Sequence, residues 1–118
     1  MDDDESIREA TKTLLRSVGY SVETFVSAEN LLQSGALQET DCLILDVRMP
    51  GIDGLELQGR LNAEGSRVPI IFISAHDDGR LRRRAIEAGA IELLRKPFEA
   101  SALLGIVHTA LGGSPPQP

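Results

Sequence analysis

Five polar residues of this sequence have the types and the spacing of a metal-assisted phosphoryl site. Asp46, Ser74 and Lys96 each closely follow an apolar run, and Asp2 and Asp3 stand just before the first expected helix. Crowded carboxylates repel one another unless a cation lies between them, and their hard oxygens suit magnesium, or manganese in its place. Beside such a metal, an ionised aspartate can attack phosphorus, while an ammonium and a hydroxyl stabilise the phosphoryl oxygens. The set therefore indicates phosphoryl transfer, although each residue alone would also suit a cap, a turn or a solvated surface.

Apolar runs alternate with amphipathic segments along the chain, and this order predicts how the five residues come together. Such alternation is typical of right-handed βαβ units, in which a parallel sheet carries helices on both faces. In these sheets the chemistry gathers beyond the carboxyl ends of the strands, where Asp46, Ser74 and Lys96 stand. The apolar runs predict strands at residues 21–26, 42–47, 68–73 and 91–94. The helical spacings predict helices at about 7–18, 28–35, 55–64, 77–88 and 101–111, the first with a capping box of Ser6 and Glu9.

Composition limits the class of protein. The 118 residues, 42% of them hydrophobic, suit one globular domain, which we expect at residues 1–111, followed by a Gly/Ser/Pro linker or tail at 112–118. A net charge of −6 argues against binding to nucleic acid or to an anionic membrane surface. One cysteine excludes a disulfide framework within the chain, and neither a spanning apolar run nor a signal peptide is present. We therefore expect a cytoplasmic domain.

Four segments of the sequence, in order and at matching spacing, resemble the receiver domain of two-component response regulators. They are DDDESIR at residues 2–8, LILDVRMPGIDG at 43–54, ISA at 73–75 and KPF at 96–98. The details around residues 74–76 and 88–90 are most similar to the nitrogen-fixation type of transcriptional regulator. The resemblance implies an α/β, flavodoxin-like, doubly wound parallel sheet of order 2-1-3-4-5.

The resemblance also implies a role for each acidic residue. Asp46 would be the phosphoacceptor, taking the phosphoryl group from the phosphohistidine of a sensor histidine kinase. Asp2 and Asp3 would help to hold magnesium, Asp3 more directly, together with Asp46. Arg48 would offer its backbone carbonyl to the same metal. Apart from its own phosphorylation and dephosphorylation at Asp46, such a domain would not be an enzyme.

The remaining implied roles concern the switch that responds to phosphorylation. Ser74 would be the hydroxyl that moves toward the phosphoryl group, and Lys96 would pair with that group. The Lys96–Pro97 peptide bond is expected to be cis, which is an uncommon state reserved largely for proline. In the family an aromatic residue usually stands three places before the lysine, whereas here that residue is Leu93. An aromatic swing is therefore excluded as the switch.

A second departure from the family concerns the first strand. Receivers begin with an apolar strand of about five residues that leads into the acidic cluster, whereas Met1 directly precedes Asp2 here. In the 2-1-3-4-5 order that strand lies between residues 21–26 and 42–47. We therefore expect an unpaired edge on strand 42–47, detached Asp2 and Asp3, and weak magnesium binding. We expect either that the natural protein is longer, or that a rearrangement, a swapped segment or dimerisation closes the gap.

Two other interpretations remain open beside the phosphorylation switch. One is a degenerate receiver that acts as a phosphorylation-independent interaction or dimerisation module. The other is a magnesium-dependent phosphatase, against which Arg48 counts because it stands where the acid of such enzymes would be. The fourth helix bears a basic face that is either solvated or, with the next strand and helix, a dimer surface. Its members are Arg80, Arg82, Arg83 and Arg84.

Overall fold

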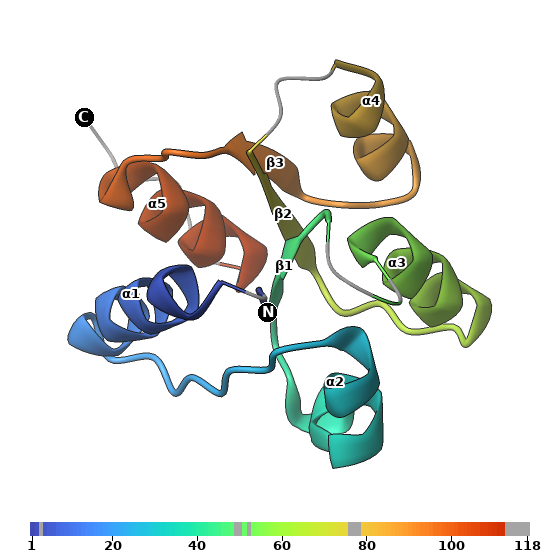
Figure 1. Ribbon diagram of the computed structural model, residues 1–118, viewed down its shortest axis with the longest axis horizontal. Helices are drawn as coiled ribbons and strands as arrows, with labels where there is room; N and C mark the ends of the chain where they lie inside the picture. Colours follow the sequence, from blue (N-terminus) through green and yellow to red (C-terminus); the bar gives the residue numbers. More distant parts are fainter. Residues whose placement is uncertain (3, 49–50, 52, 76–78, 113–118) are drawn as a thin grey trace.

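Three predicted strands form a parallel sheet at the centre of the molecule (Figure 1). The computed structural model describes residues 1–2, 4–48, 51, 53–75 and 79–112. Within these residues the strands are β1 (Leu43–Asp46), β2 (Ile70–Ser74) and β3 (Glu92–Arg95). They lie in the order β1-β2-β3, which is the arrangement of the last three strands in the expected 2-1-3-4-5 sheet.

Helices cover both faces of this sheet, as the alternation of strands and helices predicts. They are α1 (Glu5–Ser17), α2 (Ala28–Ser34), α3 (Gly54–Ala63), α4 (Gly79–Glu87) and α5 (Ala100–Ala110), with a 3-10 turn η1 (Ala36–Glu39) after α2. Because neighbouring side chains of a strand point to opposite faces, Ile71 and Phe72 enter different cores. Ile71 packs with Leu15 of α1 and Leu103 of α5. Phe72 packs with Leu57 of α3 and the other residues between the sheet and α2, α3 and α4.

Residues 21–26 form no strand, and here the sequence-based prediction was wrong. Their apolar side chains do pack on the core, Val22 on the side of α1 and α5 and Phe25 on the side of α2 and α3. A strand, however, exists only when a neighbouring strand shares its hydrogen bonds. In the expected order that neighbour is the first strand, whose place beside β1 holds only Met1 among the described residues.

Met1 pairs with β1 as a single residue of a parallel strand would. Its ammonium donates a hydrogen bond to the Ile44 carbonyl, and its own carbonyl accepts the Asp46 N–H at 2.9 Å. This pattern is that of a parallel bridge opposite Leu45. The expected loss of pairing at this point of the edge was therefore wrong, and so was the detachment of Asp2, which is only 2% exposed. Asp3 lies outside the described residues.

The first helix begins earlier than the capping box predicts. Asp4, rather than Ser6, is the N-cap, because its carboxylate accepts the N–H groups of Ser6 and Ile7 at 2.9 and 3.3 Å. An aspartate at this place satisfies two of the unpaired N–H groups of the first turn and complements the positive end of the helix dipole. The same acidic run that supplies Asp2 to the site therefore also starts α1.

Gly54, the first residue of α3, is required by the close approach of β1. A Cβ atom there would lie 2.5 Å from the carbonyl oxygen of Asp46 and 2.9 Å from the Phe72 ring. We expect Gly54→Ala to lower the free energy of unfolding by about 1–3 kcal/mol, as overpacking commonly does. Gly59→Ala in the same helix is the matched control, since nothing lies within 4 Å of its Cβ position; it should stabilise the protein by about 0.5–1 kcal/mol. Urea unfolding of both variants checks this, and equal effects would contradict it.

Candidate functional site

Asp46, Ser74 and Lys96 lie at the carboxyl edge of the sheet, as predicted. Asp46 ends β1 and Ser74 ends β2, with 7% and 1% of their surfaces exposed. Lys96 follows β3, and its backbone N–H donates to the Ser74 carbonyl at 2.6 Å. Parallel strands in register present their carboxyl ends together, so residues 22 to 50 positions apart in the chain become neighbours.

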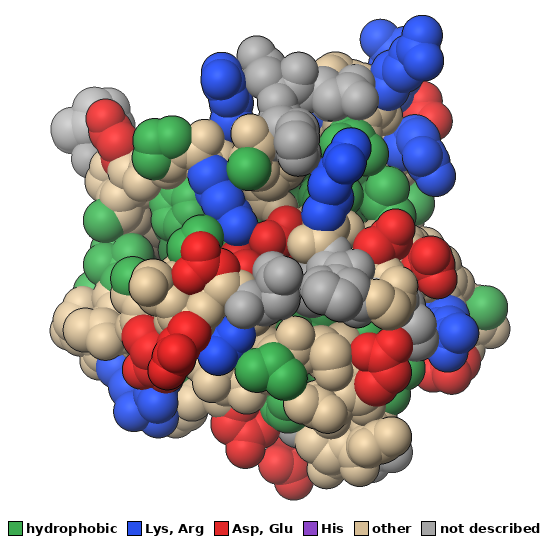
Figure 2. Space-filling model, in the orientation of Figure 1, with side chains coloured by type: hydrophobic (Ala, Val, Ile, Leu, Met, Phe, Trp, Pro, Cys, Tyr) green, Lys and Arg blue, Asp and Glu red, His purple; other side chains and the backbone are tan. Residues whose placement is uncertain are grey.

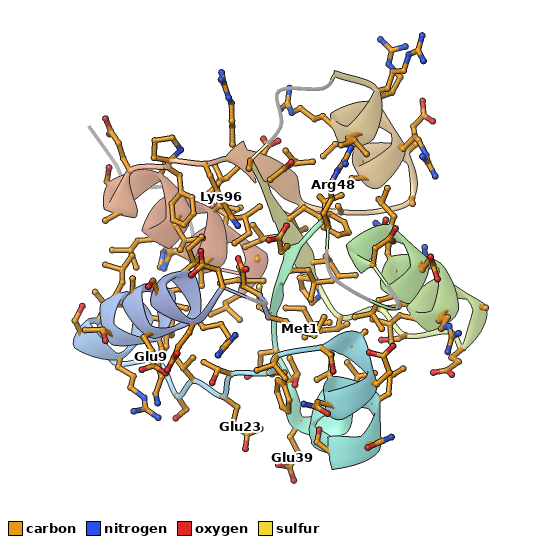
Figure 3. The ribbon with its side chains drawn as sticks, in the orientation of Figure 1. Met1, Glu9, Glu23, Glu39, Arg48 and Lys96 are labelled. Carbon is orange, nitrogen blue, oxygen red and sulfur yellow. The ribbon has the colours of Figure 1, made fainter. Side chains whose placement is uncertain are left out.

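Lys96 joins two of the predicted acidic residues. Its Nζ donates hydrogen bonds to Asp2 Oδ2 and to Asp46 Oδ2, both at 2.9 Å (Figure 3). Two carboxylates so close together would repel each other, and the shared ammonium offsets that repulsion. The site therefore contains two converging carboxylates and one cation, which are the groups that the sequence analysis selected.

Asp2 is held in place by two hydrogen bonds from residues at the start of α1, one to its carboxylate and one to its backbone carbonyl. Its Oδ1 accepts the Asp4 N–H at 2.9 Å, and its carbonyl accepts a hydrogen bond from Arg8 Nη1 at 2.8 Å. Arg8 is a supporting residue that the sequence analysis assigned no role. The available signal was its position in the first turns of α1, where a long side chain can reach back to the residues before the helix.

Asp46 is oriented by the chain that follows it. The Arg48 N–H donates to Asp46 Oδ1 at 3.0 Å, which leaves Oδ2 to Lys96. Gly54 then returns the chain to β1, its N–H donating to the Val47 carbonyl at 2.9 Å. The predicted use of the Arg48 carbonyl as a metal ligand stays a prediction, and Met49 and Pro50 of the same loop lie outside the described residues.

The two carboxylates differ in acidity. Burial raises the pKa of Asp46, the nearby Asp2 charge adds to this, and the hydrogen bonds from Lys96 and Arg48 only partly offset it. Burial would also raise the pKa of Asp2, but the Asp4 N–H and the Lys96 ammonium outweigh it, so that pKa is lowered. Burial would lower the pKa of Lys96, yet its two carboxylate partners raise it. The raised pKa of Lys96 favours its charged form, whereas the raised pKa of Asp46 means that its ionised form costs stability.

Asp46→Asn should stabilise the unmodified protein at neutral pH. A pKa raised by folding means that the folded state binds the proton more tightly than the unfolded state, so ionised Asp46 destabilises the fold above that pKa. The neutral amide removes this cost. The difference in the free energy of unfolding between this variant and the parent protein should shrink as the pH falls toward about 4. At that pH the Asp46 carboxyl of the unfolded chain also takes up its proton.

Urea unfolding at several pH values measures the effect of Asp46→Asn, with Asp41→Asn as the control. Asp41 is exposed before the opposite end of β1, and its substitution should change stability by less than about 0.5 kcal/mol. A lower stability of Asp46→Asn at pH 7 would contradict the raised pKa of Asp46. A stability gain that grows as the pH falls would contradict it as well.

The carboxylate oxygens at this site are ligands of the type that a hard divalent cation prefers. Asp2 and Asp46 already direct carboxylate oxygens at a shared cation, and oxygen ligands of this type suit magnesium. Among the described residues no three His, Cys, Asp or Glu side chains gather as a metal cluster. Asp3, the third predicted acidic ligand, lies outside those residues.

Two further sequence-based expectations concern the chain around Lys96. The Lys96–Pro97 peptide bond is cis, as expected. Leu93, which stands in the place of the usual aromatic residue, is half-buried and packs against the core formed with α2, α3 and α4. Leu93 therefore contributes to core packing.

The basic face of α4 is partly engaged with the sheet. Arg82 donates from Nε and Nη2 to Glu92 Oε1 of β3, at 3.0 and 2.8 Å. Arg82 is exposed and Glu92 is only partly buried, so this ion pair adds little stability and chiefly fixes geometry. Figure 2 shows basic side chains gathered over the α4 corner of the molecule. On the inner side of α4, the amide of the buried Gln58 donates to the Ala85 carbonyl at 3.0 Å and links α3 to α4.

A hollow of about 550 Å³ lies between the residues that follow Asp46 and α4. Its walls include Arg48, next to Asp46, and Leu81 and Arg84 of α4. Residues that directly follow Asp46 and residues of α4 therefore line one hollow. No helix in the described part of the chain is long and apolar enough to span a bilayer.

Comparison with known proteins identifies the family. The sequence model of the response regulator receiver domain matches residues 1–108. The chain is 45% identical to the response regulator protein TodT of Pseudomonas putida and 40% identical to the transcriptional regulatory protein FixJ of Azorhizobium caulinodans, in each case over 99% of its residues. It covers 52% and 56% of those two proteins, so it spans about half the length of the curated relatives that it matches.

The structural comparison agrees. A receiver protein from Burkholderia phymatum superposes with a TM-score of 0.82 at 44% identity, covering 99% of this chain and 95% of that one. The parallel sheet, the carboxyl-edge site and these matches lead to one conclusion: the chain belongs to the response regulator receiver domain family and has its α/β fold.

Proposed function

We propose that this domain is a phosphorylation-controlled switch whose phosphoacceptor is Asp46. The observation that carries the proposal is the pair of 2.9 Å hydrogen bonds by which Lys96 Nζ joins Asp46 to Asp2 at the carboxyl edge of the sheet. This arrangement places a carboxylate nucleophile beside a fixed cation. A buried ammonium next to a reacting oxygen is a group that lowers the barrier for charge moving onto a phosphoryl group.

The phosphoryl donor would be the phosphohistidine of a sensor histidine kinase. An Asp46 carboxylate oxygen attacks phosphorus, and a new P–O bond forms as the P–N bond breaks. The bonding electron pair goes to the imidazole nitrogen of the donor, which then takes up a proton. Lys96 stabilises charge on the phosphoryl oxygens during the transfer, and Ser74 is the hydroxyl that responds afterwards. Attack by water on the acyl phosphate later reverses the modification.

A magnesium ion, or manganese in its place, would be held at this site by Asp2, Asp3 and Asp46. The Arg48 backbone carbonyl would be a further ligand. When bound, such an ion neutralises phosphoryl charge. The carboxylate pair on Lys96 supports this assignment because two of the proposed ligands already share one cation.

We further propose that the signal reaches α4, β3 and α5. A phosphoryl group on Asp46 adds nearly two negative charges and new hydrogen-bond acceptors. The hollow lined by Arg48 and Arg84 supports this proposal, because it separates the chain just after Asp46 from the basic face of α4, whose Arg82 is paired with Glu92 of β3. That surface would form a homodimer or bind a partner. The proposed domain is residues 1–111, acting in the cytoplasm as part of a transcriptional regulator, with no nucleic-acid or membrane contact of its own.

Incubation of the chain with acetyl phosphate and magnesium tests the proposal. We expect intact-mass spectrometry to show one added phosphoryl group that hydroxylamine removes, as it does from acyl phosphates, and that a chelator prevents. Mapping should place the group on residues 43–48. Absence of the adduct in folded protein would remove the switch and leave the phosphorylation-independent interaction module. Steady release of phosphate from a simple phosphomonoester would instead favour the phosphatase.

A further inference from the structure

Two amide side chains of α3 hold the end of α4. Gln58 Nε2 donates to the Ala85 carbonyl at 3.0 Å, and Asn62 Nδ2 donates to the Ala88 carbonyl at 2.9 Å. Because Gln58 and Asn62 are four residues apart in one helix, their side chains lie on the same face of α3. Figure 1 shows α3 and α4 on the same side of the sheet, so α3 attaches its neighbour at two points.

Gln58 is a polar residue in a buried place. Only 2% of its surface is exposed, and burial of an amide costs free energy unless the amide is hydrogen-bonded. A leucine would need no partner there. The Ala85 carbonyl that Gln58 reaches already accepts the Ala90 N–H at 2.9 Å. Gln58 is therefore not needed to satisfy that carbonyl, and its amide instead specifies where the last turn of α4 lies.

The two amides act on the part of α4 that is already the most fixed. Among the nine residues of the helix, Ala85 alone is buried, and it belongs to the core under α3. The last four carbonyls of a helix lack partners within it. Here the Ala88 N–H closes onto the Arg84 carbonyl and the Gly89 N–H onto the Ile86 carbonyl, at 3.1 and 3.0 Å. The end of α4 is thus held both by its own backbone and by α3.

The first half of α4 borders a hollow. Leu81 and Arg84 line the hollow of about 550 Å³, whose other wall includes Asp53, the N-cap of α3. A helix that buries few side chains belongs to the part of a fold that opens at low cost. The Arg82–Glu92 ion pair lies on long side chains near the surface, and pairs of this type restrain a helix little. The first turn of α4 therefore has room beside it, whereas the last turn is fastened.

α3 is the fixed partner of the pair. Its Leu57 and Leu61 are 0% and 1% exposed and belong to the core. At its start the Gly54 N–H donates to the Val47 carbonyl at 2.9 Å, which attaches α3 to the chain just after Asp46. α3 consequently moves with the sheet, and the two amides make the last turn of α4 move with α3.

We propose that Gln58 and Asn62 form the hinge of α4, which swings about its last turn while its first turn moves across the hollow. The inference rests on the proposed function, because phosphorylation of Asp46 would shift the equilibrium between the two positions of the helix. It adds which end of α4 moves and which residues hold the other end. Gln58 and Asn62 are positioning residues, since they act on α4 and not on the reacting atoms.

Relaxation-dispersion NMR of the unphosphorylated chain tests the hinge, because it detects movements on the μs–ms timescale. We expect exchange at the amides of residues 79–84 and little at residues 88–90. In Gln58→Leu/Asn62→Ala the exchange should extend to residues 88–90, and hydrogen exchange of the Ala90 N–H should become about three- to tenfold faster. Equal exchange along all of α4 in the parent chain would overturn the hinge. Absence of exchange from α4, or a double variant that leaves residues 88–90 unchanged, would overturn it as well.

Stability measurements separate a hinge from general structural support. The leucine of Gln58→Leu remains buried, and the Ala85 carbonyl keeps the Ala90 N–H, so the urea midpoint should stay the same or rise. Gln33→Leu on α2 is the matched control, because Gln33 is exposed; it should change neither the midpoint nor the exchange in α4. A lower midpoint of Gln58→Leu, with faster hydrogen exchange in β2 as well as in α4, would refute the hinge.

Beryllium fluoride with magnesium, a mimic of an aspartyl phosphate, tests the link to Asp46. In the parent chain we expect chemical-shift changes at residues 79–84 that fade by residues 88–90, and in the double variant changes that continue through residues 88–90. Changes as large at residues 88–90 as at 79–84 in the parent chain would contradict the hinge. A chain that neither binds the mimic nor forms the acyl phosphate would count against the proposed function, whereas the dispersion measured without the mimic would still decide the hinge.

Discussion

Asp46→Asn should abolish formation of the acyl phosphate. The amide retains the shape of the side chain, and its one oxygen can replace either the acceptor of the Lys96 ammonium or the acceptor of the Arg48 N–H. It lacks the anionic oxygen that attacks phosphorus, and no base near it could create one. Mass spectrometry after incubation with acetyl phosphate and magnesium should therefore show only the unmodified protein, whereas the parent chain gains one phosphoryl group.

Asp41→Asn provides the comparison for this experiment. Asp41 stands before the opposite end of β1 and is exposed, so its amide variant should be labelled as fully as the parent. Thermal unfolding of both variants establishes that each is folded. Labelling of Asp46→Asn at the parental level would show that another carboxylate is the acceptor, and peptide mapping would then name it.

Lys96→Met should be the most destabilising substitution at the site. The lysine side chain is only 16% exposed, and its ammonium is shared by Asp2 and Asp46. Methionine keeps the apolar stem but leaves two nearly buried carboxylates facing each other. Loss of one partner from a buried ion pair costs about 3–5 kcal/mol, and because water reaches part of this site we expect about 2–4 kcal/mol by urea unfolding at pH 7.

The pH dependence and a second variant identify the cause of that loss. Without Lys96 the pKa of Asp46 should rise further, since the lysine hydrogen bond now lowers it, and the cost of Lys96→Met should decrease as acid protonates Asp46. Adding Asp46→Asn to Lys96→Met should recover much of the lost stability. A double variant as unstable as the sum of the two single effects would mean that Lys96 acts through packing rather than charge.

Local patterns were enough to predict most of the sheet and the composition of the site. The apolar runs before Asp46, Ser74 and Lys96 are strands, because segments of four or five apolar residues ending at a polar one have few other places to be buried. Once those strands are parallel and adjacent, their carboxyl ends must meet. The resemblance to the receiver family added further detail, such as the cis peptide bond before Pro97.

The errors arose where long-range contacts override local pattern. Residues 21–26 have the composition of a strand, but no strand lies beside them among the described residues, and β-structure requires a paired strand. The predicted detachment of Asp2 failed because Met1 alone can make two hydrogen bonds to β1. Neither result can be read from neighbouring residues, since Met1 and Asp46 are far apart in the chain.

The acidic residues at the start of the chain show the same contrast between what the sequence predicts and what the tertiary structure decides. The acidic residues at the start of the chain were identifiable as a possible metal site from their type and place. That Asp4 would cap α1, that Asp2 would be buried against Lys96, and that Arg8 would hold the Asp2 carbonyl depended on the packing of α1 beside β1. Residue types therefore set which chemistry is available, whereas the approach of distant segments determines which side chains share one cation.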